Sequence, residues 1–295
     1  MRRAGGRVGG WAVAAAAALA LASPPARLPA QLGDGVALLA GSTRSAALAG
    51  AGVAVMGDAG SAFANPAGIA TIHHFALEAS DEKYAGGTTL SSAAVAVRLG
   101  RFDYGVAAQA LRPAPATTAS TDVLALSALV MRYGMIAVGT SLKYVRQGIA
   151  APQVEAWVGD AGAAIALFDI FALGASVQNL GGHQVAGAYV PRRTRVGFTM
   201  NYVDPQGSVR LLTTLEGQWP EGRPSVLVAG AEGGIRTGGI VIIARMGVSG
   251  RSSSDVSPLA LGAGLALGRL QVDYAYRSYD VPSGAMHRVG VRWAR

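Results

Sequence analysis

The sequence predicts an all-β membrane protein: a closed antiparallel outer-membrane β-barrel of about 14 strands, with a small-residue, helical N-terminal plug in its lumen. Three observations predict this fold. Beyond about Ser80, segments of roughly 8 to 13 residues alternate apolar with polar side chains. Aromatic residues stand at the ends of these segments. The chain is 51% hydrophobic and 14% charged, yet beyond residue 30 it has no apolar run of the roughly 18 residues that a membrane helix needs.

Residues 1–30 have the three parts of a secretory signal peptide. A basic start precedes the apolar run 11–22, and a Pro-rich stretch leads to a cleavage site expected after Ala30. Because the apolar run is short and prolines follow it at once, the pattern favours a cleaved leader over a membrane anchor. The formal net charge is +8, but the leader holds several of the arginines: Arg2, Arg3, Arg7 and Arg27.

The rest of the composition excludes two further classes. No basic block interleaved with aromatic residues is present, so we expect no nucleic-acid partner. The chain contains no cysteine, which excludes a disulfide framework in an exported protein. Stability must therefore come from a closed fold.

The strand prediction depends on alternation with a period of two. In residues 193–202, Val196 and Phe198 alternate with Arg195 and Gly197, so apolar and polar side chains fall on opposite faces. A soluble sandwich alternates too, but these segments approach the 9 to 11 residues that a tilted transmembrane strand needs. The same alternation occurs in residues 135–146, 209–219, 269–279 and 287–293.

The aromatic residues and the charges fit a membrane barrel. Aromatic side chains at strand ends are typical of the girdles at the two membrane interfaces. They are Tyr133, Tyr144, Tyr202, Trp219, Tyr279 and Trp293. Charges on the polar face suit a wet lumen, where we expect them to line the lumen or hold the plug by pairing rather than to contact a substrate. The predicted luminal charges are Arg195, Arg210, Glu216, Asp273, Arg277, Arg288 and Arg292.

The connections predict which end of the barrel faces which compartment. Short turns, as at 133–134 and 168–169, alternate with longer loops, and this asymmetry distinguishes periplasmic from extracellular ends. The longer loops are 112–122, 181–192 and 249–258. Regular spacing without a linker predicts one barrel domain, residues 75–295, with an even number of strands between Phe75 and Trp293.

Residues 31–74 differ from the strands and are predicted to form the plug. They are small and weakly helical, with Ser42 or Thr43 as the N-cap, and too rich in glycine for a stable free helix. The segment GDAGSAFANPAGIA, residues 57–70, is predicted to be a hinge between the plug and the first strand. Its motif residues are Asp58, Asn65, Pro66 and Gly68. We expect Asp58 to pair with a luminal arginine, Asn65 to cap or turn the chain, Pro66 to fix φ and Gly68 to permit a tight return.

Residues 44–70 resemble the N-terminal signature of the PorV/PorQ family of outer-membrane proteins, which belongs to the wider FadL-like barrel superfamily. The matching residues are Gly50, Gly52, Ala54, Asp58, Ala59, Phe63, Asn65, Pro66, Ala67 and Gly68. Residues 173–182, 193–202 and 261–293 are similar to later strands of the family. The chain departs from the usual terminal aromatic residue, because Ala294 and Arg295 follow Trp293.

The resemblance implies a non-enzymatic protein of the bacterial outer membrane that passes or binds hydrophobic small molecules. The alternative is a type IX secretion accessory protein that holds secreted cargo at the cell surface. The implied partners are outer-membrane lipid and either hydrophobic small molecules or cargo and secretion-system proteins. A structural barrel with no transport role stays open.

Three chemical alternatives are weak. Adjacent His73 and His74 would point in opposite directions on an extended chain and lack a carboxylate at ligand spacing, so we expect no metal site. A barrel-wall hydrolase using Ser283 and His287 is a minor alternative without a G-x-S-x-G motif. The glycine-rich stretches 50–57 and 262–270 do not fit a nucleotide-binding turn, so we expect no cofactor.

Overall fold

The computed structural model describes residues 40–84, 87–112, 121–147, 154–168, 170–181, 190–203, 207–250, 256–279 and 284–295. The predicted signal peptide, residues 31–39 of the predicted plug, Asp169, Ser283 and the greater part of the three longer loops lie outside these ranges. None of the helices in the described part of the chain is long and apolar enough to cross a bilayer.

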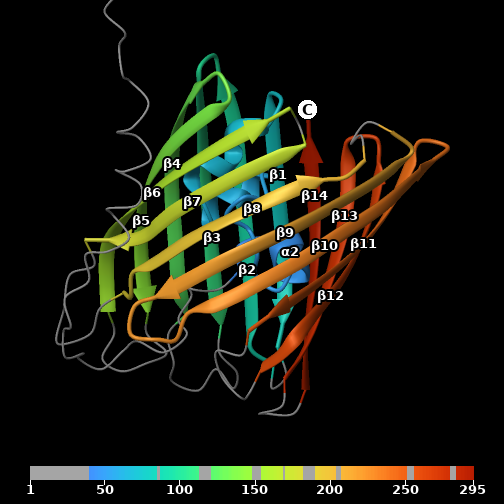
Figure 1. Cartoon of the computed structure of the whole chain (residues 1–295). Helices are drawn as coiled ribbons and strands as arrows, with labels where there is room; N and C mark the ends of the chain where they lie inside the picture. Colours follow the sequence, from blue (N-terminus) through green and yellow to red (C-terminus); the bar gives the residue numbers. More distant parts are fainter. Residues whose placement is uncertain are drawn as a thin grey trace, which may run out of the picture.

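The described residues form fourteen strands that close into an antiparallel barrel in chain order, which confirms the predicted fold (Figure 1). Closure comes from β1 against β14, in register from Ala76↔Ala294 to Lys83↔His287. The strands are β1 (Phe75–Lys83), β2 (Thr89–Leu99), β3 (Phe102–Arg112), β4 (Asp122–Tyr133), β5 (Ile136–Gln147), β6 (Val154–Leu167), β7 (Phe171–Leu180), β8 (Arg193–Asn201), β9 (Val209–Pro220), β10 (Val226–Thr237), β11 (Ile240–Ser249), β12 (Val256–Leu267), β13 (Leu270–Tyr279) and β14 (Gly284–Ala294).

The two ends of the barrel differ in their connections. At one end, tight turns join β2 to β3, β4 to β5, β10 to β11 and β12 to β13. Each begins with a glycine at positive φ, a conformation that glycine adopts without steric cost. These glycines are Gly100, Gly134, Gly238 and Gly268. The C-terminus lies at this end (Figure 1), which short turns predict to be the periplasmic one; we call it the short-turn end and its opposite the long-loop end.

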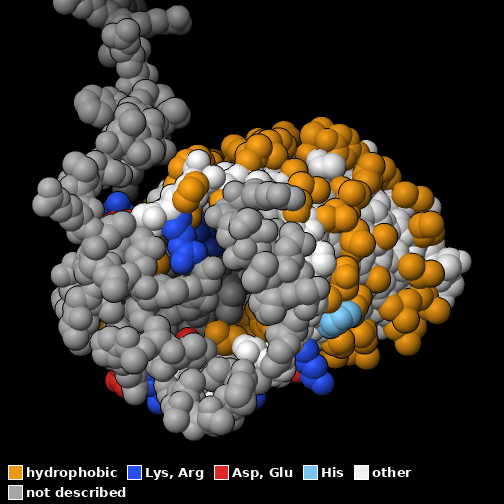
Figure 2. Space-filling view, turned by 90° about the horizontal axis from the view of Figure 1, so that it is seen from below, with side chains coloured by type: hydrophobic (Ala, Val, Ile, Leu, Met, Phe, Trp, Pro, Cys, Tyr) orange, Lys and Arg blue, Asp and Glu red, His pale blue; other side chains and the backbone are white. Residues whose placement is uncertain are grey.

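The outer face of the barrel is apolar, as a lipid-facing surface must be. Along β3, exposed and buried residues alternate almost without interruption, and hydrophobic side chains cover the wall while charges gather near the mouth (Figure 2). Aromatic rings contact one another near both rims. The ring centroids of Phe75 and Trp293 lie 5.5 Å apart at the short-turn end, and those of Tyr144 and Trp157 lie 5.3 Å apart near the long-loop end.

The plug lies inside the barrel (Figure 1). It comprises the α-helix α2 (Thr43–Ala47) and two 3₁₀ helices, η2 (Ala59–Phe63) and η3 (Pro66–Thr71). Ser42 is the N-cap of α2, and its side chain accepts a hydrogen bond from the Ser45 amide. The helix is much shorter than the small-residue stretch, because Ala49 and Gly50 both turn to positive φ and end it.

The segment 57–70, predicted to be the hinge between the plug and β1, is packed inside the plug. Asn65 caps η3 by accepting from the Ala67 amide at 3.0 Å, and its side-chain NH₂ donates to the carbonyls of Val53 and Ala163. Gly68 lies in a tight turn, with its amide donating to the Asn65 carbonyl at 2.8 Å. A Cβ there would lie 2.7 Å from the Ser61 side chain, so the glycine also permits close approach of η2 and η3.

Candidate functional site: the plug and the lumen wall

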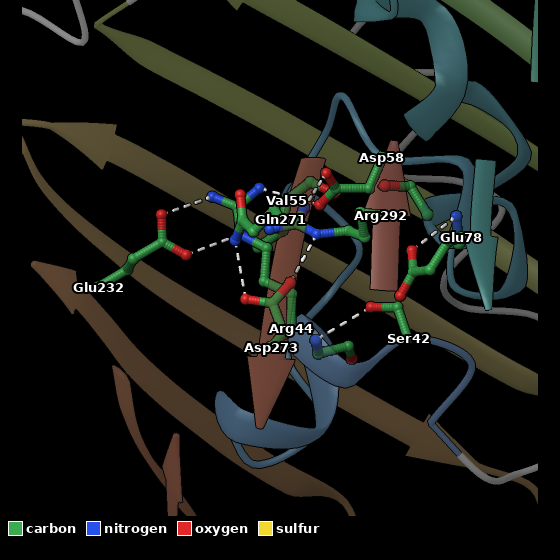
Figure 3. A network of polar contacts seen from close by, with 12 residues as sticks. Ser42, Arg44, Val55, Asp58, Glu78, Glu232, Gln271, Asp273 and Arg292 are labelled. Carbon is green, nitrogen blue, oxygen red and sulfur yellow. Dashed lines mark hydrogen bonds and ion pairs between the residues drawn. The ribbon is translucent and has the colours of Figure 1, made fainter. Parts of the chain in front are cut away.

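One side of the lumen holds a closed ring of buried ion pairs (Figure 3). Its six members alternate in charge: Arg44, Glu232, Arg245, Asp273, Arg292 and Asp58. On the wall, Arg245 of β11 contacts Glu232 of β10 and Asp273 of β13, each at 2.6 Å. Arg292 of β14 continues the ring, with its Nε 2.7 Å from Asp273.

The plug closes this ring with two of its own charges. Arg44 of α2 reaches Glu232 at 2.9 Å and Asp58 at 3.1 Å. Asp58 pairs with Arg292, so the expected partner on the wall is present. Because plug and wall charges alternate around one ring, displacing the plug would break the Arg44–Glu232 and Asp58–Arg292 pairs, and losing ion pairs is costly where the charges are buried.

The charge of Asp58 is stabilised by its surroundings. Burial alone would raise the pKa of Asp58, but its ion pairs with Arg292 and Arg44 outweigh burial and lower the pKa below its usual range. For Arg44, burial acts against the charge, yet Glu232 and Asp58 raise its pKa. Both plug charges therefore persist at neutral pH.

This lowered pKa predicts how the plug responds to acid. A carboxylate whose pKa is lower in the folded state stabilises the fold above its unfolded value, about 3.9, and loses that effect as the pH falls through the folded value. We expect the part of the conductance rise that Asp58 controls to appear only in acid below about pH 4. Asp58→Asn should already show this rise at pH 7. An equal acid response in Asp58→Asn and in the unaltered protein would contradict the assignment.

Further wall charges bind the plug backbone. Glu216 of β9 accepts hydrogen bonds from the amides of Gly52 and Val53 at 2.7 and 2.8 Å. Arg195 of β8 pairs with Glu216 at 2.6 Å and donates to the Gly50 carbonyl at 2.7 Å. The same arrangement recurs on β14, where Arg288 donates to the carbonyls of residues 40 and 41. These contacts hold the plug without depending on its side chains.

Some of the predicted luminal charges therefore contact the plug, and others contact only the wall. Arg210 of β9 pairs with Glu232, and Arg277 of β13 donates to the wall residues Ser249 and Ser257. Sequence reasoning missed Arg44, Glu232 and Arg245. Period-two alternation in β10 and β11 is the signal that puts Glu232 and Arg245 on the polar face. Arg44 begins the family motif, yet nothing local in sequence shows that its partner is 188 residues away.

The other side of the lumen carries many apolar side chains, with polar groups such as the buried Lys143–Asp160 ion pair among them. The hydrophobic lumen-facing residues of β2 to β6 form one buried cluster with Ile69 of η3 and Ile72. We call these wall residues the apolar stripe: Leu90, Leu111, Leu124, Leu126, Val130, Ala137, Val145 and Ala164. The stripe runs from the long-loop end to the short-turn end, where it meets a pocket of about 360 Å³. Barrel lumens of this class are usually polar, so the stripe calls for a functional explanation.

Wall glycines bring the plug close to the strands. A Cβ on Gly139 of β5 would lie 2.8 Å from the backbone nitrogen of Ala67, and one on Gly174 of β7 would overlap the backbone of Val53. Gly247 of β11 is similarly close to the plug backbone. The fit between plug and wall is therefore one of shape as well as charge.

The histidines lie away from these contacts. His73 and His74 are exposed just before β1. His287 faces outward, with its Nδ1 2.7 Å from the Tyr274 hydroxyl. Among the described residues, no three His, Asp or Glu side chains are grouped as in a metal site.

Solved structures show what the chain resembles. It is similar to the Ralstonia pickettii toluene transporter TbuX, with 12% identity, 86% of this chain and 98% of that chain covered, and a TM-score of 0.56. The CymD monoaromatic hydrocarbon channel matches with 12% identity, 90% and 99% coverage, and a TM-score of 0.57. The P. putida toluene transporter TodX matches with 8% identity, 86% and 98% coverage, and a TM-score of 0.54.

No protein-family model and no curated protein sequence matches the chain. The structural likeness extends over the whole length of these proteins and confirms the fold. A closed barrel with an apolar outer face and aromatic rims spans the outer membrane of bacteria, as predicted. The likeness shows the fold alone, so membership of the PorV/PorQ family and of the wider FadL-like superfamily stays a prediction. By fold, the chain is a closed antiparallel β-barrel of the outer membrane, similar in structure to these transporters and channels.

Proposed function

We propose that this protein passes small hydrophobic molecules across the outer membrane, without catalysis, along the apolar stripe. The stripe is the observation that carries the proposal, because a polar, hydrated solute gains nothing from an apolar wall, whereas an apolar one leaves water to contact it. That three similar folds are transporters or channels for toluene and monoaromatic hydrocarbons supports this substrate class.

The two sides of the plug suit this function differently. On the charged side, Arg44 and Asp58 tie the plug to β10 and β14. On the other side lies η3, whose sequence PAGIAT carries no charge, and it packs on the apolar stripe. Shifting η3 away from β4 to β6 exposes apolar surface that a hydrophobic solute can cover, while the ion pairs stay in place. Passage therefore needs movement on one side only.

Uptake by a stripe variant tests the route. Leu126 is 5% exposed and faces the lumen from β4. Leu126→Asn is expected to reduce uptake of a labelled neutral aromatic compound about 10-fold, since burying an unpaired amide beside the solute costs roughly 1–3 kcal/mol. The measurement uses proteoliposomes with lipopolysaccharide in the outer leaflet, which keeps unassisted permeation low.

Leu126→Met is the matched control, because it keeps volume and apolarity and should leave uptake unchanged. Thermal unfolding of both variants shows whether the barrel is intact. Uptake by the unaltered protein no faster than by protein-free vesicles would refute the proposed function. Equal uptake by Leu126→Asn and Leu126→Met would refute the route.

A cargo-holding role in type IX secretion remains a second prediction, and it rests on the 44–70 motif. The motif residues Asn65, Ala67 and Ala59 are buried in the plug, so the motif speaks for plug architecture rather than for a cargo-binding surface. A pull-down from a strain that has the secretion apparatus tests this role. Recovery of cargo and secretion components would favour it over passage of small molecules.

A further inference from the structure

The pocket at the short-turn end lies between the plug and the wall. Its volume is about 360 Å³, which falls within the roughly 300–1,000 Å³ of small-molecule sites. The plug contributes Met56, Ala70 and Thr71, and the wall contributes the ends of β4 to β6 with the two turns beside them. The apolar stripe ends here, since Ala137 and Ala164 belong to both.

The lining of this pocket is apolar except for Thr71 and Arg132. The Arg132 guanidinium is engaged, with its Nε 2.7 Å from buried Asp103 and its Nη2 donating to the carbonyl of Gly100. Arg132 therefore contributes its aliphatic stem to the pocket rather than a free charge. Such a lining fits a neutral molecule. Two arginines, Arg98 and Arg132, share the one carboxylate of Asp103. An anionic analogue is therefore the comparison that tests whether the pocket prefers a neutral molecule.

The rim of the pocket carries an unusual turn residue. Phe168, in the turn from β6 to β7, has a φ of 53° and is 85% exposed. The tight turns at this end place glycine at positive φ, as at Gly134 and Gly268. A bulky residue at positive φ carries strain, so a phenylalanine here implies a use for its side chain. Phe168 and Met135 line the pocket from its two adjoining turns.

We propose that this pocket is a binding site for a small neutral apolar molecule, such as a monocyclic aromatic compound, with Phe168 as the lip that covers it. The proposal rests on the proposed function. It places the last binding site of the transport route on the periplasmic side of the plug. A molecule leaving the stripe would be held against Ala164 and Ala166 until the Phe168 side chain swings aside.

Protection of a single introduced cysteine tests the site, because the chain has no cysteine of its own. In full-length Thr71→Cys protein in nanodiscs, the rate of labelling by a water-soluble maleimide is measured with increasing ethylbenzene. At a ligand concentration of about ten times the Kd, the site is close to saturated, and mass action predicts about tenfold slower labelling. Thr237→Cys, at the same end but outside the pocket, is the matched control and should show no saturable slowing.

Two further variants and one analogue sharpen the test. Adding Ala166→Phe to Thr71→Cys should fill the pocket and abolish protection, with thermal unfolding reporting an intact barrel. Adding Phe168→Gly should speed labelling without ligand and weaken protection, whereas a merely structural Phe168 would leave both rates unchanged. 4-Ethylbenzoate should protect less than ethylbenzene, and stronger protection by this anion would overturn the neutral class.

Equal slowing at Thr237→Cys, or protection that survives Ala166→Phe, would overturn the site. The outcome for the proposed function is separate. Uptake in the proteoliposome assay without protection of Thr71→Cys would refute the binding site and support the proposed function. Saturable protection without uptake would support the binding site and refute the proposed function.

Discussion

Glu232→Gln is expected to loosen the attachment of the plug to the wall and to destabilise the protein strongly. The Glu232 side chain is fully buried and pairs with Arg44 at 2.9 Å, Arg245 at 2.6 Å, and Arg210. Gln keeps the shape but removes the charge, so three arginines lose their shared partner in a buried site. Breaking one buried pair in this way costs about 3–5 kcal/mol, and the ring then holds the plug only through Asp58.

Planar-bilayer recordings and thermal unfolding measure the two consequences. We expect frequent high-conductance openings and a lower melting temperature for Glu232→Gln. Glu155→Gln is the matched control, because Glu155 is exposed on β6 and lies outside the ring; it should behave like the unaltered protein. If Glu232→Gln were as quiet and as stable as Glu155→Gln, the ion ring would not be what retains the plug.

The fold could be predicted from the sequence because local patterns specify the strands of a barrel. Alternation in residues 193–202 puts Arg195 inward and Val196 outward, as the structure has them, and the turn glycines mark the strand ends. Strand count and the luminal plug follow from the same reasoning. Face and strand are properties that one segment can specify alone.

Partners across the lumen could not be predicted in the same way. Which side chain Asp58 meets depends on register and closure around the whole barrel, and Arg292 is 234 residues away in sequence. The apolar stripe was missed for another reason. In β2, TLSSAAVAVRL, both faces carry small or apolar residues, so alternation gives little contrast between an apolar lumen wall and a lipid-facing surface.

Replacing a wall glycine by alanine gives the second large effect. Whether the protein is destabilised or stabilised depends on whether the glycine faces the plug. At Gly174 a new Cβ would overlap the carbonyl of Val53 and lie 2.9 Å from the Ala54 Cα. Backbone atoms cannot rotate away as a side chain can, so Gly174→Ala must push the plug from β7. Overpacking of this kind costs about 1–3 kcal/mol, and we expect a lower melting temperature together with increased conductance.

Gly233→Ala on β10 is the matched control, since a Cβ there meets nothing within 4 Å. Removing a glycine from a strand interior is otherwise stabilising by roughly 0.5–1 kcal/mol, so Gly233→Ala should raise the melting temperature slightly and leave conductance unchanged. Opposite signs at two strand glycines would separate plug displacement from backbone entropy. Equal, small effects at both would mean that the plug yields to the wall, and that ion pairs and hydrogen bonds rather than shape keep it in place.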